Sequence, residues 1–273
     1  MADNESYFKV LSCLNGEISQ LSLLQRSLLF AELSAVAYMN EDRAKEAVKT
    51  LGFTKVKLFE RQGAEAYIFE SEWDCVVAFR GTEPTQLNDI KADLKASMVI
   101  SETVGKVHKG FRDECDELWP MLEKVLRENT KLLYFCGHSL GAGMATICAS
   151  RCRLSSMESN LLELFTYGSP RVGNPLYIKN CYVEHIRWVN NNDVVTRVPP
   201  RFLGYNHVGD EMYLNAHGKV RTITGWQRTK DRIRGMWMGL KHGNLDNFSD
   251  HLVSNYIRFI HQAVQEEQAT TSE

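Results

Sequence analysis

Short apolar runs alternate along this chain with longer segments of helical periodicity. The runs Cys75–Arg80 and Leu132–Cys136 are apolar on both faces, as strands in the middle of a covered sheet are. Leu161–Tyr167 repeats this strand pattern, whereas Phe111–Asn129 and Gly141–Cys152 have the periodicity of helices. The alternation predicts an α/β protein with a mostly parallel central sheet covered by helices.

The two ends of the chain add further elements to this pattern. A broad apolar face predicts a helix from about Ser19 to Met39, and Asn40 can cap a second one that stops at Gly52, so residues 1–52 are assigned to N-terminal helices. Pro120 is expected to kink or divide its helix. Further strands are predicted at 53–59, 65–69, 185–189, 208–214 and 219–224 with the last two antiparallel, a helix at 249–264, and a frayed polar tail at 265–273.

Length and charge narrow the class of protein. An α/β fold of 273 residues often forms one domain, so we predict a single domain over residues 1–273. The 32 basic and 34 acidic residues give a net charge of −2, which offers no overall attraction to nucleic acid. No apolar run reaches the roughly 18 residues of a membrane span, and the acidic start is unlike a secretory leader. We expect a cytoplasmic or peripheral membrane protein, and secretion without a classical leader stays open.

The cysteines do not form a recognisable framework. There are seven, an odd number, and no Cys-x-x-Cys pair is present. Cys148 and Cys152 lie four apart on one face of a predicted helix, without a histidine-rich partner segment. We therefore predict buried free thiols and no metal site.

The chemistry of the chain is concentrated at Gly137–Gly141, which reads Gly-His-Ser-Leu-Gly. The motif lies between a predicted strand and a predicted helix, and this context distinguishes a nucleophile turn from a chance match. The turn must be tight enough to strain the backbone of Ser139, and glycines two residues away on each side remove the resulting collisions. Ser139 is the candidate nucleophile.

A serine nucleophile needs a base and an acid that orients the base, expected in the chain order Ser, acid, His. Asp193 follows a predicted strand directly, where sheets place functional residues. Asp210 is a competitor, but it falls in a strand-like alternation that favours a solvent-facing role. His251, at the start of the last helix, is favoured over His261, which lies ten residues further along that helix.

Six motifs follow one another between about residues 65 and 262. They are Phe79–Thr82, Val107–Phe111, Gly137–Ala142, Tyr167–Asn174, Asn192–Pro200 and Asp250-His251. In sequence and in order they closely resemble the motifs of the class 3 lipases, the family of the filamentous-fungal triacylglycerol lipases, which also has bacterial and plant members.

The resemblance implies an α/β-hydrolase fold with a nucleophile elbow and a short lid. It also implies that Ser139, Asp193 and His251 form the catalytic triad. The backbone N–H of Leu140, directly after the nucleophile, is one expected donor to the oxyanion. In the family the second donor is the residue at Thr82, which can offer both its N–H and its hydroxyl.

The resemblance places a lid at residues 83–95. Its apolar stripe is narrow for the family, and this departure argues against pronounced interfacial activation. Asp93 matches the family's Asp-Leu pair and could hold the Thr82 hydroxyl in position. A solvated charge on a lid helix is an equally open interpretation of Asp93.

The implied function is that of a lipase or esterase, a serine carboxylester hydrolase that cleaves acylglycerols through an acyl-enzyme on Ser139. Neither a metal nor an organic cofactor is needed for this chemistry. A phospholipase A1 or galactolipase is the alternative with the same mechanism. A catalytically inert lipid-binding protein on the same fold is the alternative of another class. No nucleic-acid partner is expected.

A basic, tryptophan-containing stretch, Trp226–Lys241, is the remaining unusual segment. It has five basic residues, one acidic residue and an apolar helical face, as in helices that lie on anionic membranes. Docking on a membrane or lipid-droplet surface is one interpretation. Glycines at 235, 239 and 243 also permit close packing within the protein, and this second interpretation is favoured from the sequence.

Overall fold

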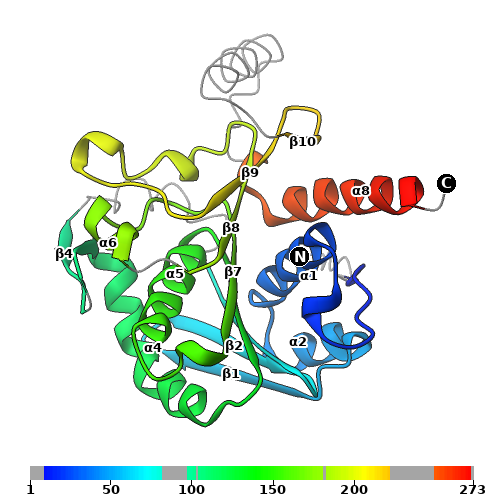
Figure 1. Ribbon diagram of the computed structural model, residues 1–273, viewed down its shortest axis with the longest axis horizontal. Coiled ribbons are helices and arrows are strands. Elements are labelled where there is room, and N and C mark those ends of the chain that lie inside the picture. Colours follow the sequence, from blue (N-terminus) through cyan, green and yellow to red (C-terminus); the bar gives the residue numbers. More distant parts are fainter. Residues whose placement is uncertain (1–8, 82–96, 103, 181–182, 222–248, 272–273) are drawn as a thin grey trace, which may run out of the picture.

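The computed structural model describes residues 9–81, 97–102, 104–180, 183–221 and 249–271 (Figure 1). Eight strands form the main sheet, in the order β1-β2-β3-β6-β7-β8-β9-β10. Pairing is parallel from β3 through β6, β7 and β8 to β9, and antiparallel at both ends of the sheet. The strands are β1 Lys55–Arg61, β2 Ala64–Glu70, β3 Asp74–Phe79, β6 Leu132–His138, β7 Leu161–Tyr167, β8 His185–Asn190, β9 Asp210–Leu214 and β10 Val220–Arg221. A separate two-stranded sheet pairs β4 (Met98–Ile100) with β5 (Lys106–His108).

Helices cover both faces of the main sheet (Figure 1). One face carries α1 (Leu23–Val36), α2 (Glu41–Val48) and α8 (Val253–Thr271). The other carries α4 (Lys109–Glu128), α5 (Leu140–Arg153) and α6 (Pro175–Asn180). Short 3-10 turns connect several elements: η1 Ile18–Gln20, η2 Lys49–Leu51, η4 Glu158–Asn160, η5 Val195–Arg197, η6 Arg201–Leu203 and η7 Ser249–His251.

The two-sided apolar strands are explained by two core clusters, one on each face of the sheet. Along β6, Tyr134 and Cys136 belong to the cluster beneath α1 and α8, whereas Leu133 and Phe135 belong to the cluster beneath α4 and α5. Successive side chains of a strand point to opposite faces, so both sets must be apolar. The predicted covered, mostly parallel sheet is confirmed.

The predicted start of the chain is also confirmed in its main features. Helix α1 begins at a capping box in which Ser22 and Gln25 exchange hydrogen bonds. Asn40 caps α2, and Gly52 ends the following turn in the left-handed conformation, with φ of 74°. β9 and β10 pair in antiparallel fashion, as expected.

Pro120 was expected to kink or divide its helix, and the expected division was wrong, because α4 is one helix from Lys109 to Glu128. The residue is exposed, while Leu118 and Leu122 face the core, so water can reach the carbonyl that the proline leaves without its helical donor.

The polar end of the chain is not a frayed tail, because α8 continues through residues 265–271. Side chains of the rest of the molecule hold this part of the helix. The hydroxyl of Ser22 donates to Glu267 at 2.6 Å, and Lys219 pairs with Glu266. These long-range contacts cannot be read from a polar composition.

Six of the seven cysteines lie in the described part of the chain, all as free thiols, and every one except Cys13 is buried. The predicted buried thiols are thus confirmed at those five positions. Within the described ranges, no helix has the length and apolar character to cross a membrane.

Candidate active site

Ser139 sits at the sharp turn between β6 and α5, with φ of 59° and ψ of −128°. Few non-glycine residues adopt a positive φ, so this backbone is strained. Two glycines allow the turn. A Cβ on Gly137 would lie 2.5 Å from the carbonyl carbon of Gly141, and one on Gly141 would lie 2.9 Å from that of Arg80. The expected steric reason for Gly-x-Ser-x-Gly is therefore present in the structure.

Asp193 and His251 meet beside this turn. Asp193 follows β8, and His251 ends the 3-10 turn η7 just before α8. The Nδ1 atom of His251 lies 2.9 Å from the Oδ2 atom of Asp193, and both side chains are almost fully buried. Because the carboxylate can only accept, Nδ1 carries the proton, and the lone pair of a neutral ring is on Nε2.

The serine and this pair share one small region. The N–H of Ser139 donates to the carbonyl of Tyr167 at 3.0 Å. The next residue, Gly168, packs so closely that a Cβ there would lie 2.7 Å from Asp193 Oδ2 and 2.8 Å from His251 Nδ1. Among the described residues, neither Ser139 Oγ nor His251 Nε2 has a hydrogen-bond partner. In the described part of the chain, the donor and the acceptor that a proton transfer needs are therefore not engaged by other groups.

Three donors surround the buried Asp193 carboxylate. Oδ1 accepts the N–H of Val195 at 2.9 Å. Oδ2 accepts the phenol of Tyr256 at 2.6 Å in addition to His251. Burial alone would raise the pKa of Asp193, but the His251 charge and the bonds from His251 and Tyr256 outweigh it and hold that pKa below its ordinary value. Asp193 is therefore ionised at neutral pH and can orient the imidazole.

A second histidine lies against the first. His138, from the nucleophile turn, has its ring centroid 4.6 Å from that of His251. Its Nε2 atom lies 2.6 Å from the His251 carbonyl oxygen, and its Nδ1 atom lies 2.9 Å from the Tyr38 phenol oxygen. Burial, and then the charge of His251, lower the pKa of His138 to about 3. His138 is a neutral ring.

The asparagines at the end of β8 and directly after it hold the turn that carries His251. The Asn190 side chain donates to the Asp250 carbonyl at 2.9 Å. The Asp250 carboxylate accepts the side chain of Asn191 at 3.0 Å and the N–H of Asn192 at 3.2 Å. This polar stretch thus supplies both the acid and the support for the loop of the base.

The structure separates the predicted candidates. Asp210 is an exposed residue at the start of β9, as expected, and His261 lies part-exposed on α8 beside Gln265. Leu140 is the first residue of α5, so its N–H has no acceptor within the helix. Thr82, Asp93, the expected lid at 83–95 and the stretch Trp226–Lys241 lie outside the described residues.

Tyr38, His138 and Tyr256 were not recognised from the sequence as parts of the site. His138 occupies the variable second position of the Gly-x-Ser-x-Gly motif. Each hydroxyl or ring nitrogen is used across a large sequence separation, 100 residues for Tyr38 with His138 and 63 for Tyr256 with Asp193. The available signal was general, since buried tyrosine hydroxyls usually have hydrogen-bond partners.

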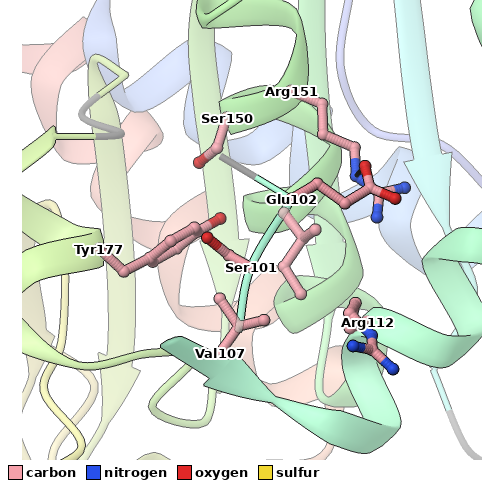
Figure 2. A pocket seen from close by; sticks show the side chains of 8 residues that line it. Ser101, Glu102, Val107, Arg112, Ser150, Arg151 and Tyr177 are labelled. Carbon is pink, nitrogen blue, oxygen red and sulfur yellow. Dashed lines mark ion pairs between the residues drawn. The ribbon is translucent and has the colours of Figure 1, made fainter. Parts of the chain in front are cut away.

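A small cavity between α4, α5 and α6 lies apart from this site (Figure 2). The Arg151 guanidinium enters it but already pairs with Glu102, at 3.1 Å, and with Asp116. None of Ser139, Asp193 and His251 lines this cavity. Its charges belong to an ion-pair network that joins the helices.

The main sheet is mostly parallel, and its strand β6 leads through the strained Ser139 into a helix. The acid and then the histidine follow along the chain. This combination defines an α/β-hydrolase. The sequence pattern of the family described as Lipase (class 3) matches residues 76–203. Over this part of its length, the chain is similar to the class 3 lipases.

Individual relatives agree with this placement. The chain is 32% identical over 176 residues to a lipase of Rhizomucor miehei, covering 59% of this chain and 48% of that protein. It is 28% identical over 224 residues to the toxin TseL of Vibrio cholerae, covering 67% and 34% respectively. The chain thus spans less than half the length of these curated relatives.

A solved structure is similar to this chain over a larger part of the chain than these relatives are. It is that of a triacylglycerol lipase whose catalytic centre is formed by a serine protease triad. The match has a TM-score of 0.60 and 26% identity, and covers 72% of this chain and 82% of the solved one. The α/β-hydrolase fold predicted from the resemblance is confirmed.

Proposed function

We propose that the chain is a serine carboxylester hydrolase that cleaves fatty-acyl esters of glycerol. The observation that carries the proposal is the buried His251–Asp193 pair, joined at 2.9 Å, beside a serine held in a strained turn. The names of the Rhizomucor lipase and of the solved triacylglycerol lipase support an ester of glycerol as the substrate.

In the proposed reaction, Ser139 Oγ attacks the ester carbonyl while His251 Nε2 takes its proton. The C–O bond to the alcohol then breaks, and the proton passes from His251 to the leaving oxygen. Water, deprotonated by the same histidine, attacks the acyl-enzyme, and the fatty acid leaves as the serine regains its proton. Asp193 orients the imidazole and stabilises its charged form. No metal or organic cofactor takes part in these steps.

The oxyanion of the tetrahedral intermediate needs hydrogen-bond donors. We assign the N–H of Leu140 as one, because it lies next to the nucleophile at the start of α5. Thr82 is proposed as the second on the resemblance of its motif. It directly follows Gly81 in the sequence, where a Cβ would lie 3.2 Å from the Cβ of Ser139. Asp93 remains the proposed support of Thr82.

Covalent labelling tests the proposed nucleophile. A fluorophosphonate probe should modify the wild type at Ser139, identified by peptide mass spectrometry, and hydrolysis of p-nitrophenyl butyrate should stop with labelling. Ser139→Ala should neither react nor hydrolyse, because the only changed group is a hydroxyl. Ser169→Ala, which removes a buried hydroxyl bonded to the Pro170 carbonyl, is the control and should retain both. A wild type that resists the probe would identify an inert lipid-binding protein instead.

The assignment of the base is tested by two histidine variants. His251→Ala should lower kcat on the order of 10⁴-fold, since members of a triad act as a unit. His261→Ala removes a part-exposed ring on α8 whose Nε2 atom lies 3.4 Å from the Gln265 side chain, and this variant should keep most of the activity. Comparable kinetics for both variants would refute the choice of His251.

The basic stretch Trp226–Lys241 supports a narrower proposal about the substrate surface. Its charge would attract anionic lipids at a membrane or lipid droplet in the cytoplasm, with about 1 kcal/mol per basic residue near the surface. Cleavage of phosphatidylglycerol in preference to triolein would favour the phospholipase A1 alternative, and cleavage of galactolipid the galactolipase alternative.

A further inference from the structure

His138 connects three parts of the molecule that are distant in sequence. It belongs to the nucleophile turn, its Nε2 atom lies 2.6 Å from the carbonyl oxygen of His251, and its Nδ1 atom lies 2.9 Å from the phenol oxygen of Tyr38. The ring is buried between these partners, with 4% of the residue exposed.

The partners determine which nitrogen carries the proton. A carbonyl oxygen can only accept, so His138 Nε2 must be protonated. The ring is neutral, because burial lowers its pKa to about 3, and Nδ1 therefore bears the lone pair. Tyr38 must then donate its phenol proton to Nδ1. The carbonyl of His251 thus fixes the tautomer, and Tyr38 donates to the lone pair that this tautomer leaves on the buried Nδ1 atom.

Tyr38 comes from a part of the chain that precedes the family match at residues 76–203. It directly follows the end of α1, where its N–H donates to the Ala35 carbonyl at 3.1 Å. Its phenol oxygen lies against Gly81, where a Cβ would collide with it. The segment between α1 and α2 thus contacts both the nucleophile turn and the end of β3 through the side chain of Tyr38.

We propose that Tyr38 and His138 form a positioning pair that holds the backbone of His251, and with it the imidazole, in the orientation needed for proton transfer. The expected effect of the pair on the reaction rate rests on the proposed function, whereas the pair itself follows from the contacts of His138. Without the bond from Nε2, the His251 carbonyl would lose a buried donor from the nucleophile turn. A displacement of the base by about 1 Å can lower the rate about 10²-fold.

Kinetics of matched variants test the pair. His138→Gln places an amide near the position of Nε2, whereas the shorter side chain of His138→Asn does not reach it. We expect kcat for p-nitrophenyl butyrate to fall about 10²-fold in His138→Asn, with KM little changed, and to recover at least tenfold in His138→Gln. Equal kcat in the two variants would overturn the proposal.

Tyrosine variants test the donor to Nδ1. Tyr38→Phe should lower kcat about tenfold, since the buried Nδ1 atom of His138 loses its donor and the ring is held from one side only. Tyr67→Phe is the control, because it removes a neighbouring phenol that donates to the Met39 carbonyl at 2.8 Å, not to His138. Urea unfolding midpoints of both variants are to be compared. Equal activity of Tyr38→Phe and Tyr67→Phe would refute the role of Tyr38.

Nitrogen-15 NMR of the histidine rings tests the pair without reference to hydrolysis. In the wild type, His138 should show a protonated Nε2 and an unprotonated Nδ1, unchanged between pH 5 and 9. Tyr38→Phe should shift the Nδ1 signal toward that of a lone pair without a donor, while Nε2 stays protonated. A protonated Nδ1 in the wild type would overturn the inference even if the enzyme is active. If the ring signals are as predicted but no fluorophosphonate labels the protein, the proposed function is refuted and the Tyr38–His138 pair stands.

Discussion

At the scale of single residues, the best-defined feature of the site is the carboxylate of Asp193. Three donors reach its two oxygens, and two of them, His251 and Tyr256, share Oδ2. Tyr256 is itself fixed, because its oxygen accepts the N–H of Asn190 at 3.0 Å. That bond occupies a lone pair of the phenol and directs its proton to the acid. Tyr256 therefore positions Asp193, and through it the imidazole.

We predict that Tyr256→Phe lowers kcat for p-nitrophenyl butyrate about tenfold. The change removes a donor that favours the ionised acid, so the pKa of Asp193 should rise, and the buried Asn190 N–H loses its acceptor. Stability should fall by about 1–3 kcal/mol, the usual effect of one unsatisfied buried group. Steady-state kinetics and urea unfolding measure the two effects.

Tyr167→Phe separates the two effects. Tyr167 is fully buried, its ring lies 6.0 Å from that of Tyr256, and its phenol donates to the Ser27 carbonyl, away from Asp193. This variant should lose comparable stability and keep its activity. Matched kcat values in the two phenylalanine variants would leave Tyr256 with a structural role only.

At the scale of elements, the turn from β6 into α5 depends on how closely the backbones of β6, α5 and the end of β3 approach one another. Gly141 stands where the first turn of α5 meets the end of β3, against the carbonyls of Phe79 and Arg80. Gly143, two residues on, faces the ring of Phe111, with the nearest ring atom 2.9 Å from a Cβ built there. A side chain can move aside, whereas the central strand of a packed sheet cannot.

Gly141→Ala should therefore destabilise the fold by about 2–3 kcal/mol and abolish activity, because the added methyl pushes the nucleophile turn away from β3. Gly143→Ala adds the same methyl and gains the same helix propensity, about 0.5–1 kcal/mol. It should cost less than half as much and retain activity. Thermal unfolding with ester hydrolysis distinguishes them, and similar losses in both would show that β3 does not limit the turn.

At the scale of the whole molecule, several buried neutral histidines make stability depend on pH. Burial lowers the pKa of His138 and His185 to about 3 and that of His108 to about 4. The unfolded chain therefore binds more protons at these sites below pH 6.5, and the free energy of unfolding falls as the pH is lowered. Glu114 acts in the opposite direction, because burial raises its pKa to about 7 and the folded state binds its proton first.

His185→Gln isolates one of these contributions. The glutamine can keep the bond to the Thr166 hydroxyl, 2.7 Å from His185 Nε2, but does not titrate. Burial, and then the charge of Arg187, lower the pKa of His185, so its contribution is fully present above pH 6.5 and is lost as the pH falls toward 3. Between pH 6 and pH 4 the wild type should lose about 1.4 kcal/mol per pH unit more than the variant, measured by urea unfolding. Parallel pH profiles would refute this contribution, because they would show that His185 binds its proton equally in the folded and unfolded states.

The sequence by itself determined what depends on neighbouring residues. The two-sided apolar strands required a covered sheet, and the glycines around Ser139 required a turn that only a small, strained backbone can make. Chain order and loop position then indicated Asp193 and His251, which the structure places 2.9 Å apart. Only the tertiary structure decided how these groups are held. Tyr38 and Tyr256 carry no local signal, because a buried phenol can satisfy its hydroxyl with many partners and the fold selects one. The same reason explains the end of α8, whose polar side chains look unsupported until Ser22 and Lys219 are brought beside them.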